Sequence, residues 1–319
     1  DKYWDPGKPH LEKLIFRIVP DASARAVGLE SGDLDLGGPW PVPIADLARL
    51  GGLPHLALET RGYGMVSPMF YLEFNMRDPM FKDVRIRRAV AHAINTAQLA
   101  EVVWQQFAVP ATGPISDRLT RFYSPNVPRY EYAPKKAEAL LDEAGFRRGS
   151  DGVRMRLTLD AAPYDDNYLR SGEFVRQQLR QVGIEASMRS QDTATYFRRV
   201  WTANEFQLNL YGISNTPDPT IGVQRVYWSK NIVKGAPFTN GSGYSNPQMD
   251  RILEAAQVEA DPQKRRKLWE EFQQLAMTDL PIIPLLRPEM VTVVNRRVKN
   301  LVAGGLGVYD TFADVAIDR

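Results

Sequence analysis

A glycine-rich loop in the second half of the chain carries residue types suited to holding a small molecule. In the stretch from Asn240 to Asp250, the side chains of Asn240, Tyr244 and Ser245 surround two glycines. Glycine lets backbone amides approach a ligand closely, and tyrosine combines an apolar ring with a polar tip. The alternative interpretation is a surface turn ahead of a helix that begins at Pro247.

Aromatic and acidic residues close to this loop widen the set of candidates. Tyr211 and Trp228 offer rings on which a ligand can stack, although core packing is the more common role of such residues. Asp218 stands between two prolines, which is typical of a turn or a helix cap as well as of a charged anchor. For each residue both interpretations stay open at this level.

Patterns of catalytic and metal-binding residues do not occur in the sequence. There is no cysteine, the three histidines are scattered, and no nucleophile elbow, phosphate loop or dinucleotide fingerprint is found. The acids Asp165-Asp166 and Glu270-Glu271 are adjacent, so on a helix or strand their side chains diverge rather than converge on a substrate. We therefore expect no metal, no cofactor and no enzymatic activity.

Length and composition bound the class of protein further. The 319 residues are 44% hydrophobic, which is enough for about two domains with buried cores. Lys and Arg number 40 against 38 Asp and Glu, and this balance argues against nucleic acid as a partner. No apolar run approaches the roughly 20 residues needed to span a bilayer. The chain opens at Asp1 without a methionine or a signal segment, so we expect a processed chain or a fragment.

Hydrophobic periodicity predicts a mixture of helices and strands. Alternation at Leu14, Phe16 and Ile18 predicts a half-buried strand, and Asp21 is expected to cap a helix that Gly32 ends. Up to about residue 75 we expect several strands and little helix. Later elements are a parallel βαβ unit over 153–188, helices at 247–260 and 262–279, and strands at 282–286 and 291–294. The predicted fold class is α/β with mixed sheets.

Short motifs follow one another in a set order from Tyr3 to Pro281. They are Tyr3-Trp4, Leu14-Ile-Phe-Arg-Ile18, Asp83-Val-Arg-Ile-Arg-Arg-Ala89, Gly212-Ile-Ser-Asn-Thr-Pro-Asp-Pro219, Asp261-Pro-Gln-Lys-Arg-Arg266 and Asp279-Leu-Pro281. In this order they resemble the bacterial extracellular solute-binding proteins of family 5, the binding components of peptide- and nickel-type ABC importers. Each motif is weak alone, but the series covers almost the whole chain.

The resemblance implies a periplasmic-binding-protein-like fold (type II, class C) with two lobes. Residues 1–75 would form an incomplete first lobe, 76–286 the second lobe, and 287–319 a return into the first. The N-terminal part of the family fold would be missing from the chain. The hinge strands would cross near Phe74-Asn75 and near Leu285-Leu286, and the lobes would close over ligand.

The resemblance also assigns candidate binding residues. The family's loop at Gly212–Pro219 lies at the binding cleft, and the position of its ligand-pairing aspartate falls here on Asn215 or Thr216. Ala162 occupies the position before Pro163-Tyr164 at which dipeptide-binding members carry a basic residue. Both departures argue against a free dipeptide, because neither charged anchor is present. They favour a longer or modified peptide or another solute.

The implied function is capture of a small, peptide-like ligand and its delivery to an ABC permease in the inner membrane. The implied location is the periplasm, with the signal segment outside this chain, and we expect a monomer that does not bind nucleic acid. A hydrolase acting on peptides or sugars, and a sensor module using the same fold, are the alternatives.

Overall fold

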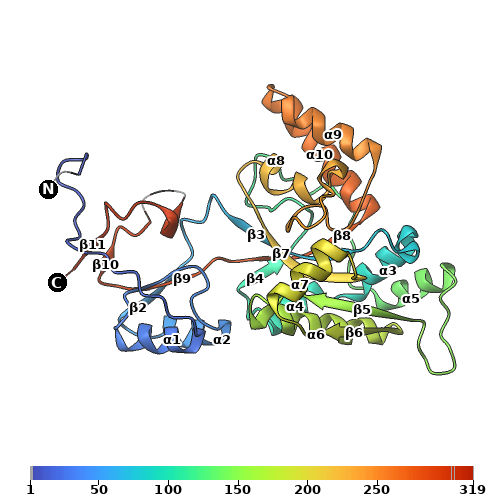
Figure 1. The fold of residues 1–319 in the computed structure, drawn as a ribbon, viewed down its shortest axis with the longest axis horizontal. Coiled ribbons are helices and arrows are strands. Elements are labelled where there is room, and N and C mark those ends of the chain that lie inside the picture. Colours follow the sequence, from blue (N-terminus) through green and yellow to red (C-terminus); the bar gives the residue numbers. More distant parts are fainter. Residues whose placement is uncertain (1–2, 303, 305, 319) are drawn as a thin grey trace. The chain divides into compact units, whose positions relative to one another are not determined.

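The chain folds as two compact units joined by two crossings. The computed structural model describes residues 3–302, 304 and 306–318. Unit 1 contains Asp1–Ser67 and Glu289–Arg319, and unit 2 contains Pro68–Pro288. Figure 1 shows the two sets of elements. The unit boundary at Ser67 is at the start of a strand, whereas the expected boundary near residue 75 falls just beyond the end of that strand.

Unit 1 is built from two short helices and two small antiparallel sheets. Its elements are α1 (Ala22–Ser31), β1 (Leu36–Gly37), α2 (Ile44–Gly51), β2 (Leu56–Glu59), β9 (Thr292–Asn295), β10 (Val298–Lys299), the 3-10 turn Gly307–Tyr309 and β11 (Ala316–Ile317). The strand orders are β1-β9-β2 and β10-β11. The predicted start and end of α1 are confirmed: Asp21 Oδ1 accepts from Ala24 N at 2.7 Å, and Gly32 stops the helix in the left-handed conformation.

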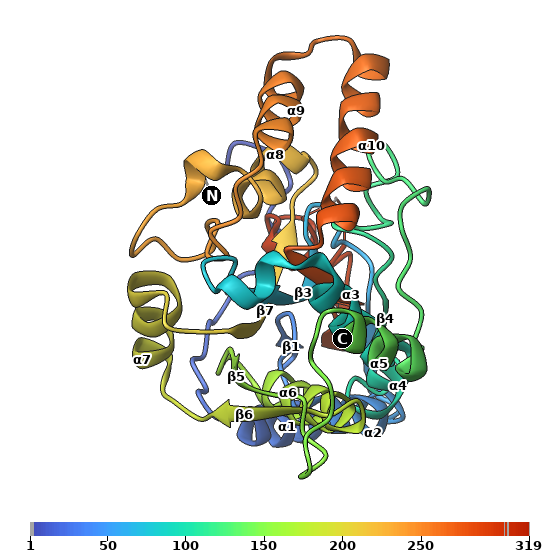
Figure 2. The ribbon, with the colours of Figure 1, turned by 90° about the vertical axis from the view of Figure 1, so that its right-hand side faces the viewer.

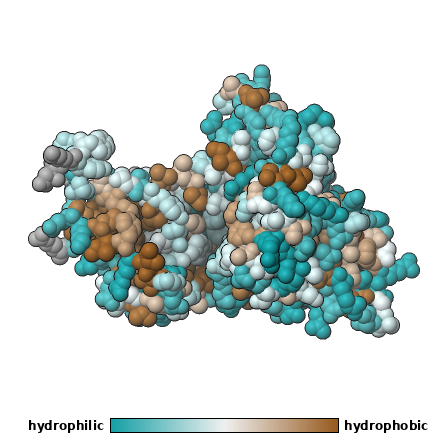
Figure 3. Space-filling view, in the orientation of Figure 1, coloured by the Kyte–Doolittle hydropathy of each residue, from teal (hydrophilic) through white to brown (hydrophobic). Residues whose placement is uncertain are grey.

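The strand predicted at Leu14–Ile18 does not form. This segment is irregular, and Ile15, Phe16 and Ile18 are 72%, 78% and 92% exposed. In Figure 3 apolar surface gathers on this part of unit 1, near β10 and β11. Alternation makes a strand only when a neighbouring strand supplies hydrogen bonds, and among the described residues none pairs with this segment.

The expectation of little helix before residue 75 is also wrong, because α2 forms in addition to α1 in this part of the chain. Ile44, Leu47 and Leu50 are buried along one face of α2. Their spacing of three residues is helical, but the eight-residue run is too short to stand out among its prolines.

Unit 2 contains a mixed six-stranded sheet in the order β4-β8-β3-β7-β5-β6. Its strands are β3 (Ser67–Phe74), β4 (Ala108–Pro110), β5 (Met155–Ala161), β6 (Ile184–Arg189), β7 (Leu208–Asn215) and β8 (Ile282–Pro288). β5 runs parallel to both β6 and β7, which confirms the predicted βαβ unit, and β8 runs antiparallel to β3 and β4. β3 and β7 run in opposite directions, since Asn75 N donates to Gln207 O while Tyr71 stacks on Tyr211.

Helices cover both faces of this sheet. They are α3 (Val84–Ala93), α4 (Thr96–Val102), α5 (Pro134–Glu143), α6 (Asp166–Gln181), α7 (Thr193–Phe197), the π-helix Arg198–Ala203, α8 (Pro219–Gly222), α9 (Pro247–Val258) and α10 (Pro262–Asp279), with 3-10 turns at Pro79–Lys82, Gln224–Val226 and Ser229–Asn231. Successive residues of β3 serve the two layers: Phe70 packs against Trp104 and Tyr168, whereas Tyr71 packs against Tyr211.

The two predicted C-terminal helices form a hairpin. α9 and α10 lie side by side in Figure 2, and each begins with proline at its first turn behind a capping side chain, Asn246 and Asp261. Buried Met249, Leu253 and Phe272 join this hairpin to the core of unit 2. None of the helices in the described ranges is both long and apolar enough to cross a membrane.

Candidate ligand-binding site

One edge of the unit 2 sheet is where chemistry is expected. β5, β6 and β7 are parallel; β5 and β6 end at about the same level, at Ala161 and Arg189, whereas β7 continues past Leu210, the partner of Ala161, to Asn215. In open α/β sheets ligands bind outside the carboxyl ends of the strands, where the loops are free to carry side chains. Unit 2 also begins and ends at this edge, because β3 starts at Ser67 and β8 finishes at Pro288.

The polar side chains at the end of β7, Asn215 and Thr216, form hydrogen bonds with neighbouring segments of unit 2. Asn215 is fully buried, and its Oδ1 accepts from Ser116 N at 2.8 Å, which ties the end of β7 to the segment after β4. Asn215 Nδ2 has no hydrogen-bond partner among the described residues. Thr216 Oγ1 donates to Asp218 O at 3.0 Å. The loop packs so closely on α8 that a Cβ on Gly222 would approach Thr216 N to 2.4 Å.

Asp218 is engaged in a structural ion pair. Its Oδ1 caps α8 by accepting from Thr220 N at 2.9 Å, which confirms the capping interpretation. Arg265 of α10 contacts both carboxylate oxygens, at 2.7 and 2.8 Å. Burial alone raises the pKa of Asp218, but the hydrogen bonds from Arg265 and Thr220 outweigh it and lower that pKa to about 2. The carboxylate therefore stays charged and fastens α8 to α10.

The glycine-rich loop uses its own polar groups internally. Asn240 is buried, and its Nδ2 donates to Trp228 O at 3.1 Å and Tyr244 O at 2.8 Å, while its Oδ1 accepts from Ser242 Oγ at 2.8 Å. A Cβ on Gly241 would come within 2.5 Å of the Trp201 ring, so this glycine permits close packing on an indole.

The remaining predicted residues divide by exposure. Tyr244 is buried with its hydroxyl 2.5 Å from Asp279 Oδ2, and Ser245 is exposed. Trp228 is half-buried and donates to Glu254 Oε1 at 3.1 Å. Tyr211 is fully buried, and its hydroxyl has no partner among the described residues.

The structure therefore separates the predicted residues into two sets. Asn240, Tyr244 and Trp228 are tied to one another by the loop hydrogen bonds. Tyr211 and Asn215 instead lie on the sheet beside Tyr71, whose pKa is raised by burial and lowered in part by the Asn215 amide. Neither set is shown to contact a ligand, and all eight residues stay predictions as binding residues.

Sequence reasoning missed Arg225, which lies beside the second set. Arg225 is half-buried in the 3-10 turn after α8, between fully buried Val223 and Val226. Burial lowers the pKa of its guanidinium, and electrostatic contacts with Tyr211 and Tyr71 act against that change. The signal in the sequence is a cation in the run Val223-Gln-Arg-Val226, which has apolar residues close on both sides.

An aromatic surface at the end of β5 was missed as well. Tyr164 is 38% exposed, and its ring lies 6.3 Å from that of Phe197 and 6.4 Å from that of Phe238. Phe238 is itself 5.9 Å from Trp201. Rings of this kind provide apolar walls for a small ligand.

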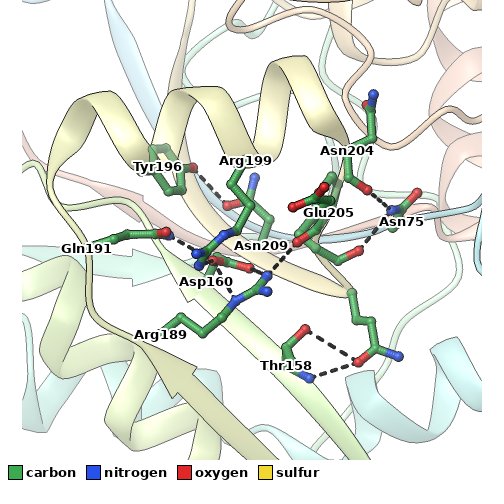
Figure 4. Close-up of polar contacts among 12 residues, drawn as sticks. Asn75, Thr158, Asp160, Arg189, Gln191, Tyr196, Arg199, Asn204, Glu205 and Asn209 are labelled. Carbon is green, nitrogen blue, oxygen red and sulfur yellow. Dashed lines mark hydrogen bonds and ion pairs between the residues drawn. The ribbon is translucent and has the colours of Figure 1, made fainter.

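A polar cluster around Asp160 lies on the same face of the sheet (Figure 4). The carboxylate of Asp160, fully buried on β5, accepts from Arg189 Nε at 3.1 Å and Gln191 Nε2 at 2.8 Å, and Arg199 lies 3.6 Å away. Asn209 extends the network, because its Oδ1 accepts from Tyr196 Oη at 2.8 Å.

Asn209 also connects this cluster to a buried glutamate. Its Nδ2 donates to Glu73 Oε2 at 3.0 Å. Burial raises the pKa of Glu73 to about 7, partly offset by Asn209 and by Arg77. Glu73 Oε1 has no partner in the part of the chain that the structure describes.

Metal binding and surface cavities add no further candidate. Among the described residues no three His, Cys, Asp or Glu side chains are grouped to hold a metal ion. Two surface cavities of about 480 and 570 Å³ occur in unit 2, one beside α10 and one beside α6, and neither contains a predicted binding residue.

A mixed sheet covered on both faces and joined by two crossings to a second α/β unit is the architecture of a bilobed binding protein. Residues 1–235 match the middle region of the bacterial extracellular solute-binding proteins, family 5. The chain belongs to this family, as the order of its motifs indicated.

The curated relatives are named for different ligands. The chain is 27% identical to heme-binding protein A of Haemophilus influenzae over 322 residues, covering 100% of this chain and 56% of that protein. It is also 27% identical to the glutathione-binding protein GsiB of Salmonella typhimurium, covering 92% of this chain and 56% of that protein. The chain thus spans about half the length of the curated relatives it matches.

Solved structures share the fold. HbpA2 from Haemophilus parasuis superposes with a TM-score of 0.80 at 27% identity, covering 99% of this chain and 60% of that one. The oligopeptide-binding protein AppA from Bacillus subtilis, in complex with a nonapeptide, gives 0.80 at 21% identity, covering 95% of this chain and 60% of that one. The periplasmic-binding-protein fold predicted from the motifs is confirmed.

Proposed function

We propose that this protein is the solute-binding component of an ABC importer, which captures a peptide-like ligand and delivers it to a membrane permease. Membership of family 5 is the observation that carries the proposal. The half-exposed rings of Tyr164, Phe197 and Phe238 support it, because they supply apolar walls at the ligand-binding edge of the unit 2 sheet.

A peptide longer than a dipeptide, or a chemically modified one, is the ligand class that we favour. Asn215 and Thr216, at the position of the family's ligand-pairing aspartate, carry no charge for a free amino terminus. Glutathione, named in one group of relatives, is a modified tripeptide of this kind. We retain Tyr211, Asn215, Thr216, Asp218, Asn240, Tyr244, Ser245 and Trp228 as proposed binding residues.

Unit 1 and unit 2 are proposed to be the two lobes of the binding protein. We place the hinges at Ser67-Pro68 and Pro288-Glu289, where the division between the units falls, rather than near Phe74-Asn75, because Phe74 and Asn75 lie within unit 2. We further propose a periplasmic location, a monomeric state and binding without chemical change of the ligand.

A thermal-shift panel on the protein as its gene encodes it tests the proposal. The panel contains free dipeptides, tetrapeptides with free or acetylated amino ends, glutathione, heme and nickel–histidine. A ligand at 100 times its Kd stabilises by about 2.7 kcal/mol, which is a clear shift. We expect stabilisation by tetrapeptides or glutathione, and mass spectrometry should recover the bound molecule unchanged.

Two results would contradict the proposal. Stabilisation by heme or nickel–histidine with no response to any peptide would move the ligand to another class. Recovery of a cleaved peptide would favour the hydrolase alternative.

A further inference from the structure

Arg225 is a guanidinium taken partly out of water without a counter-charge. Its Nε has no hydrogen-bond partner among the described residues, and no ion pair joins it to a carboxylate there. Removing a cation from water is costly unless an anion or several acceptors replace the lost hydration. The fold nevertheless holds Arg225 in place between buried Val223 and Val226.

Two side chains near Arg225, Tyr211 and Asn215, can donate hydrogen bonds and also lack partners. Tyr211 Oη and Asn215 Nδ2 are fully buried with no hydrogen bond within the described residues. Tyr71 interacts electrostatically with Tyr211 and with the Asn215 amide, and its own hydroxyl donates a hydrogen bond to Pro114 O at 3.1 Å. This corner of unit 2 therefore offers a positive charge and unused hydrogen-bond donors, and Arg225 is the member that reaches solvent.

Arg265, in the same unit, is an arginine whose guanidinium nitrogens all have hydrogen-bond partners. It binds Asp218 through two nitrogens, donates to Thr220 Oγ1 at 2.7 Å and donates through Nε to Ala256 O at 2.8 Å. Every one of these hydrogen bonds from Arg265 goes to an oxygen acceptor. Among the described residues Arg225 has no such set, so the missing partner is an acceptor with negative charge.

A carboxylate is the partner that fits this corner. It carries acceptors only, it has the planar geometry that a guanidinium fork binds with two parallel hydrogen bonds, and it is small enough for a half-buried position. A cation or a second hydrogen-bond donor would leave Arg225 and the Asn215 amide nitrogen unpaired.

We propose that Arg225, backed by Asn215 and Tyr211, is the subsite for a carboxylate of the bound ligand. This rests on the proposed function, since it assigns one end of a peptide-like solute to unit 2. It also explains how a chain with Ala162 at the basic position before Pro163-Tyr164 would hold a carboxylate: the cation comes instead from the turn after α8.

The first test compares one binding peptide with its C-terminal amide, in the wild type and in Arg225→Gln. Arg121→Gln is the matched control, because Arg121 is an exposed arginine of the same unit that lies over the Phe122 ring. In the wild type and the control, amidation should weaken binding about tenfold or more, as expected for loss of a charge-assisted pair. In Arg225→Gln the two peptides should bind equally. Persistent discrimination against the amide in Arg225→Gln would overturn the proposal.

The second test does not depend on a peptide ligand. The ¹⁵N–¹H resonance of Arg225 Nε, assigned by its disappearance in Arg225→Gln, is followed during titration with sodium acetate and, separately, sodium phosphate. A saturable shift of Arg225 with acetate, absent for Arg121, supports the subsite even if every peptide fails to bind. Equal small shifts of both arginines, or saturation by phosphate alone, would overturn it.

Discussion

Two polar clusters lie on the same face of the unit 2 sheet, and they differ in whether their charges are paired. Around Asp160 they are: Arg189 and Gln191 bind the buried carboxylate, and Arg189 Nη2 also donates to Glu205 O at 2.7 Å, while Gln191 Oε1 has no partner among the described residues. Around Arg225 no carboxylate of the described residues pairs with the cation, and Tyr211 and Asn215 keep unused polar atoms there.

The difference separates polar groups that hold the fold from groups that are available to a ligand. A network whose charges are paired stabilises one arrangement of its elements and has no free charge to offer a solute. A cluster with unpaired buried polar groups lowers the stability of the ligand-free protein, and a bound acceptor removes that free-energy cost. The predictions that follow test whether the two clusters differ in this way.

The largest effect is expected from Asp160→Asn. The substitution leaves Arg189 and Arg199 without their buried counter-charge while keeping the side chain's size. Breaking one side of a buried ion pair costs about 3 kcal/mol or more, measured as the loss in free energy of unfolding by urea. Asp166→Asn is the control, since Asp166 is exposed and only 3.7 Å from Arg170 in an i,i+4 pair, which contributes about 0.5 kcal/mol or less. A loss below about 1 kcal/mol for Asp160→Asn would show that the cluster is not structural.

Glu73 lies where the two clusters meet and gives the stability of the protein a pH dependence. It is hydrogen-bonded to Asn209 and interacts electrostatically with Arg77 and with the tyrosines Tyr196, Tyr211 and Tyr227. Its pKa in the folded protein is about 7, above the ordinary value of 4.5, so the native state binds more protons than the unfolded state between these values. The associated stability is fully present below about pH 4.5 and is lost as pH rises through about 7.

Glu73→Gln should remove that pH dependence. Glutamine keeps an acceptor for Asn209 but does not ionise, so the variant should be more stable than the wild type at pH 8, by up to about 3 kcal/mol. At pH 4 the two proteins should differ little. Urea unfolding at both pH values measures this, and a variant that is less stable at pH 8 would mean that the carboxylate is charged and well solvated in the fold.

The sequence alone predicted the elements whose signals are local. The cap at Asp21, the stop at Gly32 and the two C-terminal helices behind Asn246 and Asp261 all form as predicted, because each signal lies within a few residues of its effect. The strand at Leu14–Ile18 failed since pairing depends on a partner far away in the chain.

The candidate site was less predictable for a related reason. Asn240 and Asp218 have the residue types of binding groups, but tertiary contacts with Tyr244 and Arg265 use their polar atoms. Arg225 has the residue type of a surface cation, and only the fold shows that it lacks a partner among the described residues. Residue type reveals which groups are polar, whereas the contacts decide which of them remain available.

The smallest stability effect is expected at Arg225 itself, and it distinguishes the two clusters most sharply. Because Arg225 forms no ion pair within the part of the chain that the structure describes, Arg225→Gln should leave the melting temperature unchanged or slightly raised. Arg265→Gln, which removes the bidentate contact with Asp218, should lower stability by about 1–2 kcal/mol at the same pH, since this pair is partly exposed. Differential scanning calorimetry without ligand measures both variants side by side. A loss for Arg225→Gln as large as that for Arg265→Gln would place Arg225 in the structural class with Asp160. If Arg225→Gln keeps the wild-type melting temperature but binds the peptide and its C-terminal amide equally, Arg225 acts in binding and not in folding.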